Sequence, residues 1–232
     1  MLIGLIGALD EEIALFLKKM KVEAVQVHAG IHFFKGRLTG KRVVVCKSGV
    51  GKVNAALATQ ILIDLFHVDA IIFSGVAGAL RPDVNIFDIV ISTKTQQYDV
   101  DFTAIGFPPG DIPFLETSVF EADPRLVLLA ERASAGMQIK VFKGKILTGD
   151  RFVASKKLVS LLQRNFGGLC VEAEGAATGQ VCFRNKISFV VIRGISDRAD
   201  MAAPTDFGCS VKKAAFRAQA LVWAMLKQFT VN

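Results

Sequence analysis

Residues 189–192 form a run of apolar, mostly β-branched side chains with no polar residue between them. Such a run is typical of a strand that is buried on both faces of a sheet. Arg193, Ser196 and Asp197 follow at its carboxyl end. Because ligands of α/β sheets bind outside the carboxyl ends of strands, this segment predicts a binding site. Taken alone, it is explained equally well by Asp197 capping the next element.

A second apolar run also ends in carboxylates, and it favours the binding site over the cap. Residues 169–172 are predicted to form a short strand, in which Glu172 comes last and Glu174 follows. Two successive strand ends that carry carboxylates are more than a single cap requires. We therefore expect both segments to contribute to one site at the carboxyl edge of a sheet.

Strand and helix patterns alternate along the chain. Strands are predicted at residues 2–6, 31–38, 42–47, 70–73, 88–92, 94–101, 138–147, 169–172 and from 189. Helices are predicted from an N-cap at Asp10 to about residue 20, at 52–66, from Pro124, from Ser155, at 174–183 and at about 205–229. The length suits one domain, so we expect a single α/β domain over residues 1–232, with a mixed central β-sheet flanked by helices.

The composition excludes several classes of protein. A hydrophobic share of 52% with 21% charged residues is typical of a globular domain and not of a disordered chain. No apolar run reaches the roughly 18 residues of a membrane span, and the first residues lack the basic flank of a signal peptide. The four cysteines have no metal-binding or redox spacing. We expect a cytoplasmic protein with buried free thiols and no membrane partner.

The net charge of +7 raises the question of a nucleic-acid partner. The lysines are spread along the chain, without interleaved aromatic residues and without a known binding motif. We therefore expect no nucleic-acid partner. A solvated surface accounts for the charge, and an anionic substrate is the weaker alternative.

The segment from Phe102 to Thr117 is rich in Gly and Pro and contains several large apolar side chains. On the surface of a monomer it would form an exposed apolar patch. We therefore expect this segment to cover a pocket or to contact a partner subunit.

Few reactive side chains are left for catalysis once the common motifs are excluded. The three histidines lie in no nucleophile setting, there is no Gly-x-Ser-x-Gly or Walker sequence, and no carboxylate has a neighbouring His or Cys that suggests a metal site. The remaining candidates are the carboxylates Glu12, Glu172, Glu174 and Asp197. Carboxyl groups whose environments separate their pKa values can act as acid and base in glycosidic bond hydrolysis.

Six segments of the chain resemble the motifs of the methylthioadenosine/S-adenosylhomocysteine nucleosidases, a family of the purine nucleoside phosphorylase superfamily. They are residues 3–12, 47–54, 74–78, 149–150, 171–174 and 193–197. The resemblance follows nearly the whole chain in order. It implies a nucleoside phosphorylase-like fold and an N-ribosyl hydrolase that releases adenine from 5′-substituted adenosines without a cofactor or metal.

The resemblance also implies a role for each matching residue. Asp197 would protonate N7 of the purine, and Glu12 would hold and deprotonate the attacking water, which Arg193 would help to place. Glu174 would bind the ribose hydroxyls through charge-assisted hydrogen bonds. Each residue also has a purely structural interpretation: Glu12 suits the first turn of a helix, and Arg193 suits an ion pair.

Further positions correspond to the walls of a nucleoside pocket in this family. Phe152 would stack on adenine, the backbone of Val153 would contact its edge, and Phe207 would close over the base. Val50 would line the side of the 5′ substituent, and Ser196 would lie with the substrate-binding residues. The structural alternative for Phe152 is a core position, and for Glu172 a structural carboxylate.

Family members are homodimers in which each subunit completes the 5′ pocket of the other. Ile105 and Pro113, in the apolar segment described above, match the residues that are donated to the partner. The resemblance therefore implies a homodimer and gives that segment a partner surface.

Two positions depart from the family pattern. Ala173 stands where a methionine usually packs against the sugar, and Val76 stands where many members carry a serine that contacts the water. Ala173 predicts a wider pocket. The possible substrates are therefore methylthioadenosine, S-adenosylhomocysteine, 5′-deoxyadenosine and 6-amino-6-deoxyfutalosine, on which some relatives act.

Two other functions remain open at this point. A related phosphorylase would use phosphate, but residues 71–75 lack the arginine that those enzymes carry before the central glycine motif, and Glu12 would repel phosphate. A nucleoside-binding protein without catalytic activity could share the fold. The presence of both Asp197 and Glu12 favours the hydrolase.

Overall fold

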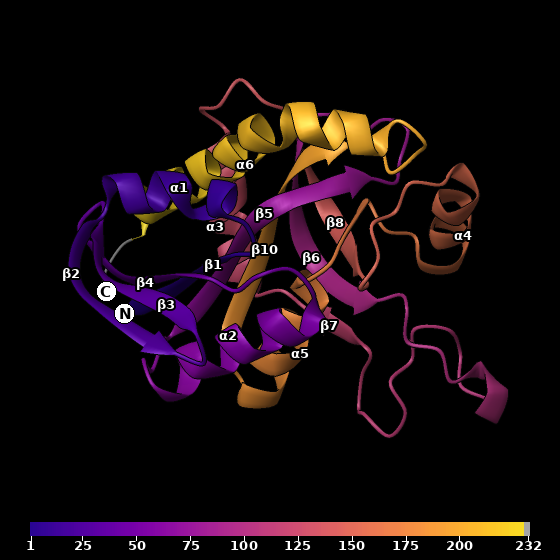
Figure 1. Ribbon diagram of the computed structural model, residues 1–232, viewed down its shortest axis with the longest axis horizontal. Coiled ribbons are helices and arrows are strands. Elements are labelled where there is room, and N and C mark those ends of the chain that lie inside the picture. The colour runs from indigo at the N-terminus through magenta and orange to yellow at the C-terminus, as the bar shows by residue number, and fades with distance from the viewer. Residues whose placement is uncertain (230–232) are drawn as a thin grey trace.

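Two parallel strands in the middle of the molecule, β5 (Ala70–Ala79) and β10 (Ser188–Asp197), organise the fold. Every residue of β5 and all but the first residue of β10 are buried. Their continuous apolar runs are therefore explained by coverage on both faces, as the sequence predicted. The computed structural model describes residues 1–229, and Figure 1 shows these two strands between two helical layers.

One side of the sheet extends from β5 through four further strands. The order is β5, then β1 (Leu2–Gly7), β4 (Lys41–Lys47), β3 (Ile31–Leu38) and β2 (Lys21–His28). β1 pairs in parallel with both β5 and β4, so the carboxyl ends of β1, β4, β5 and β10 meet at one edge. The segments that follow these ends are therefore brought together.

The other side of the sheet closes on itself. β10 pairs with β6 (Ile89–Gln97), β6 with β8 (Val141–Thr148), β8 with β9 (Cys170–Glu172), and β9 with β5, while β7 (Val119–Glu121) is attached to β6. Because β5 also pairs with β10, five strands form a closed ring, which we call the strand ring. The mixed sheet was predicted from the sequence, but its closure was not.

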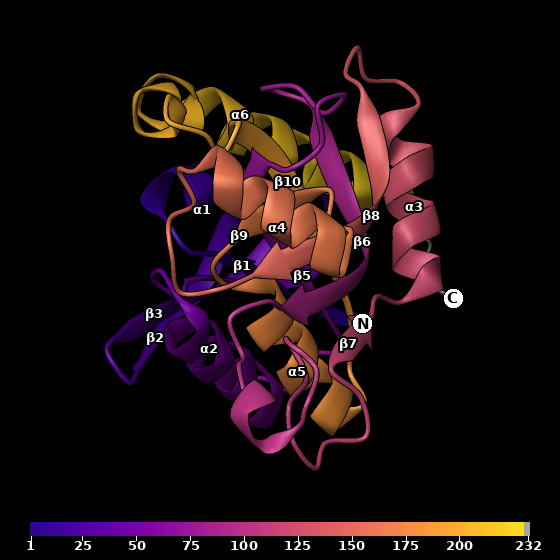
Figure 2. The same ribbon diagram turned by 90° about the vertical axis from the view of Figure 1, so that its right-hand side faces the viewer.

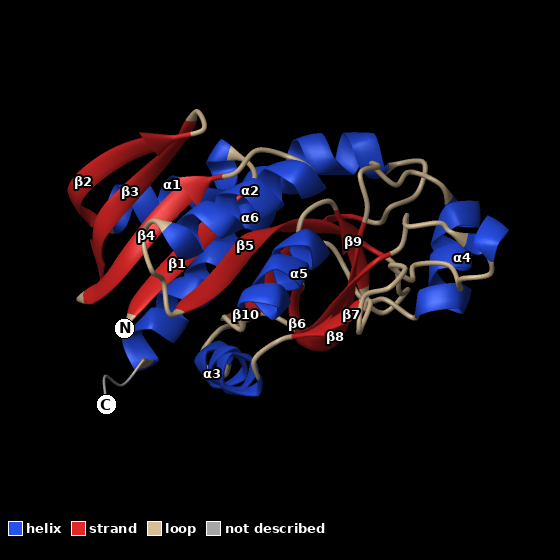
Figure 3. Cartoon of the chain, turned by 90° about the horizontal axis from the view of Figure 1, so that it is seen from below, coloured by secondary structure: helices blue, strands red, loops and turns tan. Residues whose placement is uncertain are grey.

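Helices cover both faces of the sheet (Figures 1 and 3). α1 (Asp10–Lys19), α3 (Pro124–Ser134) and α6 (Ala203–Gln228) pack on one face, and α2 (Lys52–Asp64) and α5 (Gly175–Asn185) on the other. α4 (Lys156–Phe166) covers one end of the strand ring, as Figure 2 shows, and packs Leu162 and Phe166 against Leu147 and Val171. The predicted single α/β fold with flanking helices is confirmed.

Several predicted boundaries were wrong for identifiable reasons. β5 was predicted to end at Phe73, but it continues to Ala79 because Gly75 lets the strand pass beside the buried Arg193 side chain. β2 was not predicted, since its residues have no buried face.

The N-cap of α1 is Leu9 and not Asp10, because Glu12 accepts the N–H of Leu9. The predicted strands at 88–92 and 94–101 are one strand with a bulge between Ser92 and Lys94.

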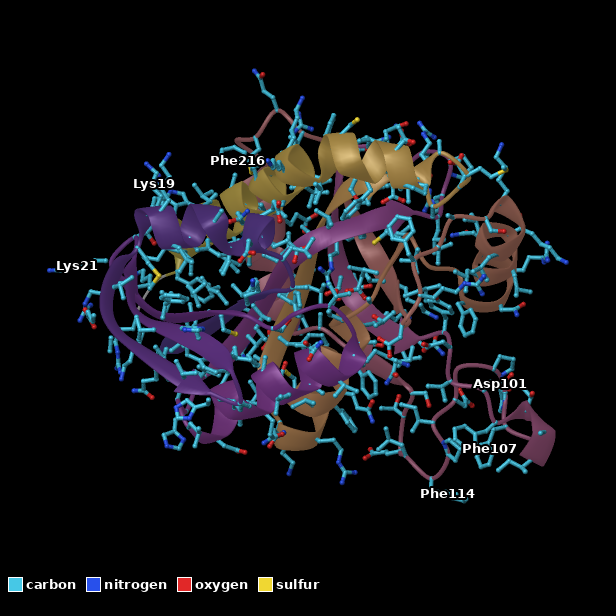
Figure 4. All side chains as sticks on the ribbon, viewed as in Figure 1. Lys19, Lys21, Asp101, Phe107, Phe114 and Phe216 are labelled. Carbon is cyan, nitrogen blue, oxygen red and sulfur yellow. The ribbon has the colours of Figure 1, made fainter. Side chains whose placement is uncertain are left out.

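The segment between β6 and β7 leaves the body of the molecule and contains a short 3₁₀ helix, η1 (Thr103–Ile105). Figure 4 shows Phe107 and Phe114 on this projecting loop, on the same side as α2 and α5 in Figures 1 and 2. Their rings contact each other with centroids 5.7 Å apart, but Phe114 remains 95% exposed and Ile105 66% exposed. Apolar side chains of this segment are thus exposed on the single chain, and the partner subunit expected for them stays a prediction.

Cys46, Cys170 and Cys182 are buried free thiols, and Cys209 is an exposed one. This agrees with the prediction from their apolar surroundings. Within residues 1–229, no helix is both long and apolar enough to cross a membrane.

Gly194 is the position where β10 and α6 approach most closely. A Cβ atom there would lie 2.8 Å from the carbonyl carbon of Ala214 and would also collide with its oxygen. We expect Gly194→Ala to lower the free energy of unfolding by about 1–3 kcal/mol, because two backbones would have to separate. Chemical denaturation followed by circular dichroism measures this change.

Gly208, in the first turns of α6, is the matched control, since a Cβ atom there has open space. Gly208→Ala should leave stability unchanged or raise it by up to about 1 kcal/mol through helix propensity. Equal destabilisation by both variants would contradict the close approach at Gly194.

Candidate active site

A cavity of about 620 Å³ opens where the carboxyl ends of β1, β4, β5 and β10 meet the ends of β8 and β9. It lies at the strand ends for which the sequence predicted a site. Its lining residues come from seven segments: Ala8, Leu9, Glu12, Val50, Gly51, Val76, Ala77, Gly78, Asp150, Arg151, Phe152, Val153, Val171, Glu172, Ala173, Glu174, Ser196, Asp197 and Phe207. Most of the residues predicted for the site are therefore brought together.

Glu12 occupies the third position of α1, and its buried carboxylate is held by three backbone N–H groups. Oε2 accepts from Ala8 at 2.6 Å and from Leu9 at 3.1 Å, and Oε1 accepts from Val76 at 2.8 Å. Burial raises the pKa of Glu12, while the Arg193 charge and these N–H groups oppose the increase. Glu12 thus stabilises the helix start and also presents a carboxyl of raised basicity to the cavity.

Asp197 ends β10 and is almost fully buried. Its Oδ1 accepts the N–H of Ala199 at 2.8 Å, and the Ser196 hydroxyl donates to Oδ2 at 2.8 Å. Burial raises the pKa of Asp197 despite these two donors. Gly78, opposite Asp197 in β5, leaves room for the carboxyl, because a Cβ atom there would lie 2.7 Å from Oδ1. Asp197 is therefore a carboxyl of raised pKa in a fixed orientation.

Arg193 lies beneath the cavity floor and is completely buried. Its Nη2 donates to Glu172 and, at 3.3 Å, to Glu174, while Nη1 lies 4.0 Å from Glu12. The guanidinium also stacks on the ring of Phe73 at 4.6 Å from the centroid. Because Arg193 does not line the cavity, it acts on the site through the three carboxylates. The ion-pair interpretation of Arg193 is confirmed.

Glu174 precedes α5 and lines the cavity, with fewer donors than its neighbours. Its Oε1 accepts the N–H of Gly51 at 2.9 Å, and its Oε2 shares Arg193 with Glu172. Burial, with further contributions from the charges of Glu172 and Glu12, raises the pKa of Glu174 to about 7 against the pull of Arg193. Glu174 therefore titrates in the neutral range.

The mouth of the cavity is aromatic and apolar. Phe152 and Phe207 meet edge to face with ring centroids 5.8 Å apart, and Phe152 is 54% exposed, so it is not a core residue. Val50 is exposed at the rim, and Val76 and Val153 are buried in the wall. The backbone N–H of Val153 makes no hydrogen bond within residues 1–229.

Besides Arg193, two predicted site residues are not among the cavity-lining residues, Ile105 and Pro113. Both belong to the connection between β6 and β7, whose projecting part carries Phe107 and Phe114 in Figure 4. Their assigned role requires a second subunit, so it stays a prediction.

One network at the cavity edge was not found from the sequence. Lys52 donates its N–H to Asp150 at 2.8 Å and its Nζ to Asp99 at 2.7 Å, and Asp99 accepts the N–H of Asp150 at 2.9 Å. This network fixes the turn in which Gly51 points its N–H at Glu174. Asp150 lies in a motif that the sequence analysis quoted, but nothing local to Lys52 or Asp99 indicates the contact.

No group of three or more His, Cys, Asp and Glu side chains in the described part of the chain is arranged to hold a metal ion.

A family model described as the phosphorylase superfamily matches residues 2–227. The strand ring and the carboxylate-lined cavity thus belong to a protein of this superfamily. The resemblance found in the sequence motifs is confirmed at this level.

Individual relatives define the family more closely. The 5′-methylthioadenosine/S-adenosylhomocysteine nucleosidase of Shewanella pealeana is 40% identical over 230 residues, 98% of this chain and 100% of that protein. The nucleosidase of the same name from Neisseria meningitidis, crystallised with methylthio-immucillin-A, superposes with a TM-score of 0.95 at 36% identity and covers 98% of this chain and 99% of that one. The native structure of futalosine hydrolase from Helicobacter pylori superposes with a TM-score of 0.94 at 34% identity, with 98% of both chains covered.

The chain belongs to the 5′-methylthioadenosine/S-adenosylhomocysteine nucleosidase family. It is an enzyme, a nucleosidase that hydrolyses N-glycosyl bonds.

The raised pKa of Glu174 has a consequence for stability. A carboxyl whose folded pKa of about 7 lies above its ordinary value of 4.5 contributes stability that is complete below pH 4.5 and is lost as the pH rises through 7. We expect Glu174→Gln, which resembles the neutral carboxyl, to unfold like the wild type at pH 4.5 and to be more stable by about 2–3 kcal/mol at pH 8.

Chemical denaturation across this pH range measures the difference. Glu131→Gln, which removes an exposed carboxylate paired with Lys143 at the surface, is the control and should show no such pH dependence. A Glu174→Gln variant that is equally destabilised at both pH values would contradict the raised pKa.

Proposed function

We propose that the enzyme hydrolyses the N-ribosyl bond of 5′-substituted adenosines and releases adenine. Water is the nucleophile, and two carboxyl groups divide the acid and base roles. Three features support the proposal: the family, the similarity to a nucleosidase crystallised with a nucleoside analogue, and the presence of two buried, oriented carboxyl groups, Asp197 and Glu12, in one cavity.

Asp197 is the general acid in this reaction. A purine leaves the ribose more easily when N7 is protonated, since the departing base is then neutral. The raised pKa of Asp197 keeps a proton available at higher pH than an ordinary aspartate would. Ser196 and the N–H of Ala199 fix the carboxyl orientation. Asp197 therefore delivers the proton to the base side of the cavity.

Glu12 is the general base that activates water. Its two oxygens are held by backbone N–H groups, so the carboxylate is oriented before the substrate arrives. The backbone N–H of Val76 helps to hold the Glu12 carboxylate, although the Val76 side chain cannot donate a hydrogen bond to the water as a serine would. Arg193 stabilises the charge of Glu12 from beneath at 4.0 Å.

Glu174 and the aromatic residues hold the nucleoside. The Glu174 carboxylate accepts hydrogen bonds from the ribose hydroxyls, which lowers the energy of the bound sugar. Phe152 stacks on the adenine, Phe207, which contacts the Phe152 ring, closes over the base, and the N–H of Val153 is available to its edge. Val50 and Leu9 line the remaining apolar wall toward the 5′ substituent.

The charge of the cavity wall is the observation that favours hydrolysis over phosphorolysis. Five lining residues are carboxylic acids, and Arg151 is the one cationic side chain among the lining residues of the described chain. A phosphate nucleophile needs fixed cations and donors, whereas water needs a base. The wall therefore repels phosphate and suits water.

The 5′ substituent is the least constrained part of the substrate. Ala173 lines the cavity and leaves space beside the sugar. The similarity to a futalosine hydrolase and to methylthioadenosine/S-adenosylhomocysteine nucleosidases is of the same order, with TM-scores of 0.94 and 0.95. The substrate range we propose therefore includes 6-amino-6-deoxyfutalosine along with methylthioadenosine, S-adenosylhomocysteine and 5′-deoxyadenosine.

A homodimer completes this site. The apolar side chains of the projecting loop are exposed in the monomer, and so are Val50, Val53 and Leu57 at the turn before α2 and along it. The projecting loop and the start of α2 lie on the same side of the molecule (Figures 1 and 2). Exposed apolar surface on two such segments is typical of a subunit interface. In the dimer, Ile105 and Pro113 of one subunit close the 5′ side of the cavity of its partner.

The reaction is tested by measuring adenine release from methylthioadenosine in phosphate-free buffer. We expect turnover without phosphate and free 5-methylthioribose as the second product. Asp197→Asn should lose roughly 10²–10⁴-fold in kcat while still binding the nucleoside, because the asparagine has no proton to give. Release that requires phosphate and yields a sugar 1-phosphate would refute the hydrolase, and an Asp197→Asn variant with the wild-type rate would refute the role of this residue.

The substrate preference is tested by filling the space at Ala173. We expect Ala173→Met to lower the ratio of kcat/KM for 6-amino-6-deoxyfutalosine to kcat/KM for methylthioadenosine by about 10-fold or more, the size of a steric effect of a few methylenes. Ala176→Gly, in the first turn of α5 and away from the cavity lining, is the control for general destabilisation. An unchanged ratio in Ala173→Met would show that the space at position 173 does not set the preference.

The dimer is tested with Ile105→Asp, which places a charge on the projecting loop. We expect sedimentation to show a larger monomer fraction and KM for methylthioadenosine to rise at least about 10-fold, because one substitution weakens the interface and the 5′ pocket together. Glu116→Lys, on the same connection between β6 and β7, serves as a charge-changing control. A fully active monomer would overturn the shared site.

A further inference from the structure

Glu172 lines the cavity but has no role in the chemistry proposed above. Among the cluster of three carboxylates around Arg193, which are Glu12, Glu172 and Glu174, it accepts the most hydrogen bonds. Its Oε1 accepts from the Thr148 hydroxyl, and its Oε2 accepts from Arg193 and from the N–H groups of Gly175 at 2.7 Å and Glu174 at 3.2 Å. Four donors from β8, β10 and the start of α5 thus converge on one carboxylate. These donors fix the position and orientation of the Glu172 carboxyl group.

Glu172 and Glu174 compete for the same nitrogen of Arg193. Nη2 makes the closer contact with Glu172 and lies 3.3 Å from the Glu174 carboxyl. Arg193 is the one cation in this cluster, and Glu12 also interacts with it at 4.0 Å. One positive charge therefore serves three buried carboxyl groups, and Glu174, which has the fewest donors, interacts with Nη2 less closely than Glu172 does.

We propose that Glu172 is a positioning residue: it holds Arg193 away from Glu174 and thereby sets the charge that Glu174 presents to the sugar. This inference rests on the proposed function of Glu174 as the ribose-binding residue. Without the Glu172 charge, Arg193 pairs fully with Glu174, whose carboxylate then stays ionised to lower pH and is less available to the ribose hydroxyls. Glu172 thus tunes affinity for the sugar without touching it.

The other titratable groups around Glu172 do not account for a change in the ionisation of Glu174 near neutral pH. The groups that interact with it electrostatically are Arg193 on β10, Glu174 before α5, Glu12 on α1 through Arg193, Cys170 on β9, and Tyr98 after β6. Burial raises the pKa of Cys170 and raises that of Tyr98 to about 12, so both stay neutral. Glu12 accepts hydrogen bonds from three backbone N–H groups, which a change at Glu172 leaves in place.

The test is a carbon NMR titration of ¹³C-glutamate-labelled enzyme without substrate, with Glu174→Gln identifying the Glu174 carboxyl resonance. We expect Glu172→Gln to lower the pKa of Glu174 by about one unit or more, since a neighbouring charge is removed and Arg193 moves closer. Glu172→Asp keeps the charge but moves it away by one methylene, so it should lower the pKa of Glu174 by less than Glu172→Gln does. Glu131→Gln, a surface carboxylate, should not shift it.

Kinetics provide a second measurement. In Glu172→Gln we expect KM for methylthioadenosine to rise by about 10-fold, with a smaller change in kcat, because the affected group binds the sugar. A Glu174 pKa that is unchanged in both Glu172→Gln and Glu172→Asp would overturn the inference and leave Glu172 a structural carboxylate. Where Glu172→Gln does not fold, Glu172→Asp carries the test alone. The titration needs no turnover, so it distinguishes this outcome from a failure of the proposed reaction.

Discussion

The guanidinium of Arg193 is buried under the cavity floor, and a buried cation is stable only where carboxylates and hydrogen bonds surround it. Glu12 from the start of α1 meets it from one segment, and Glu172 and Glu174 from a second, at the junction of β9 and α5. Each of these segments is fixed in turn by the sheet or by a helix start. The ion cluster therefore couples the packing of the fold to the chemistry of the site, because the same charges that neutralise Arg193 face the substrate.

The strand ring makes this arrangement rigid. β10 pairs with β5 on one edge and, at residues 192–194, with β6 on the other, so Arg193 lies between two neighbouring strands, while Asp197 is paired with Gly78 of β5. Glycine at positions 75 and 78 of β5 leaves the space that the Arg193 and Asp197 side chains occupy. Rigid support of this kind keeps acid, base and sugar-binding groups in one geometry, which is how positioning contributes to catalysis.

The sequence predicted the parts of this molecule that depend on local pattern. The buried strands, most helices and the carboxylates at strand ends follow from apolar runs, capping residues and motif spacing. The contacts that join distant segments do not. Nothing near Glu172 in the sequence indicates that Thr148 and Arg193 share its carboxylate, and nothing near β2 indicates a strand, because its side chains have no buried face. Ring closure likewise depends on the pairing of β5 with β10, more than 100 residues apart.

That long separation has a consequence for how the chain is made. β5 is complete by residue 79, yet its central partner β10 begins at residue 188, so more than 100 residues are synthesised between the two strands. Until β10 is made, the edge of β5 that it covers has no neighbour, and contacts of such high sequence separation form slowly. The nascent chain therefore passes through a period in which β1, β4 and β5 are exposed to association with other chains. Residues 188–228 end this period, because they supply both the missing strand and the covering helix α6.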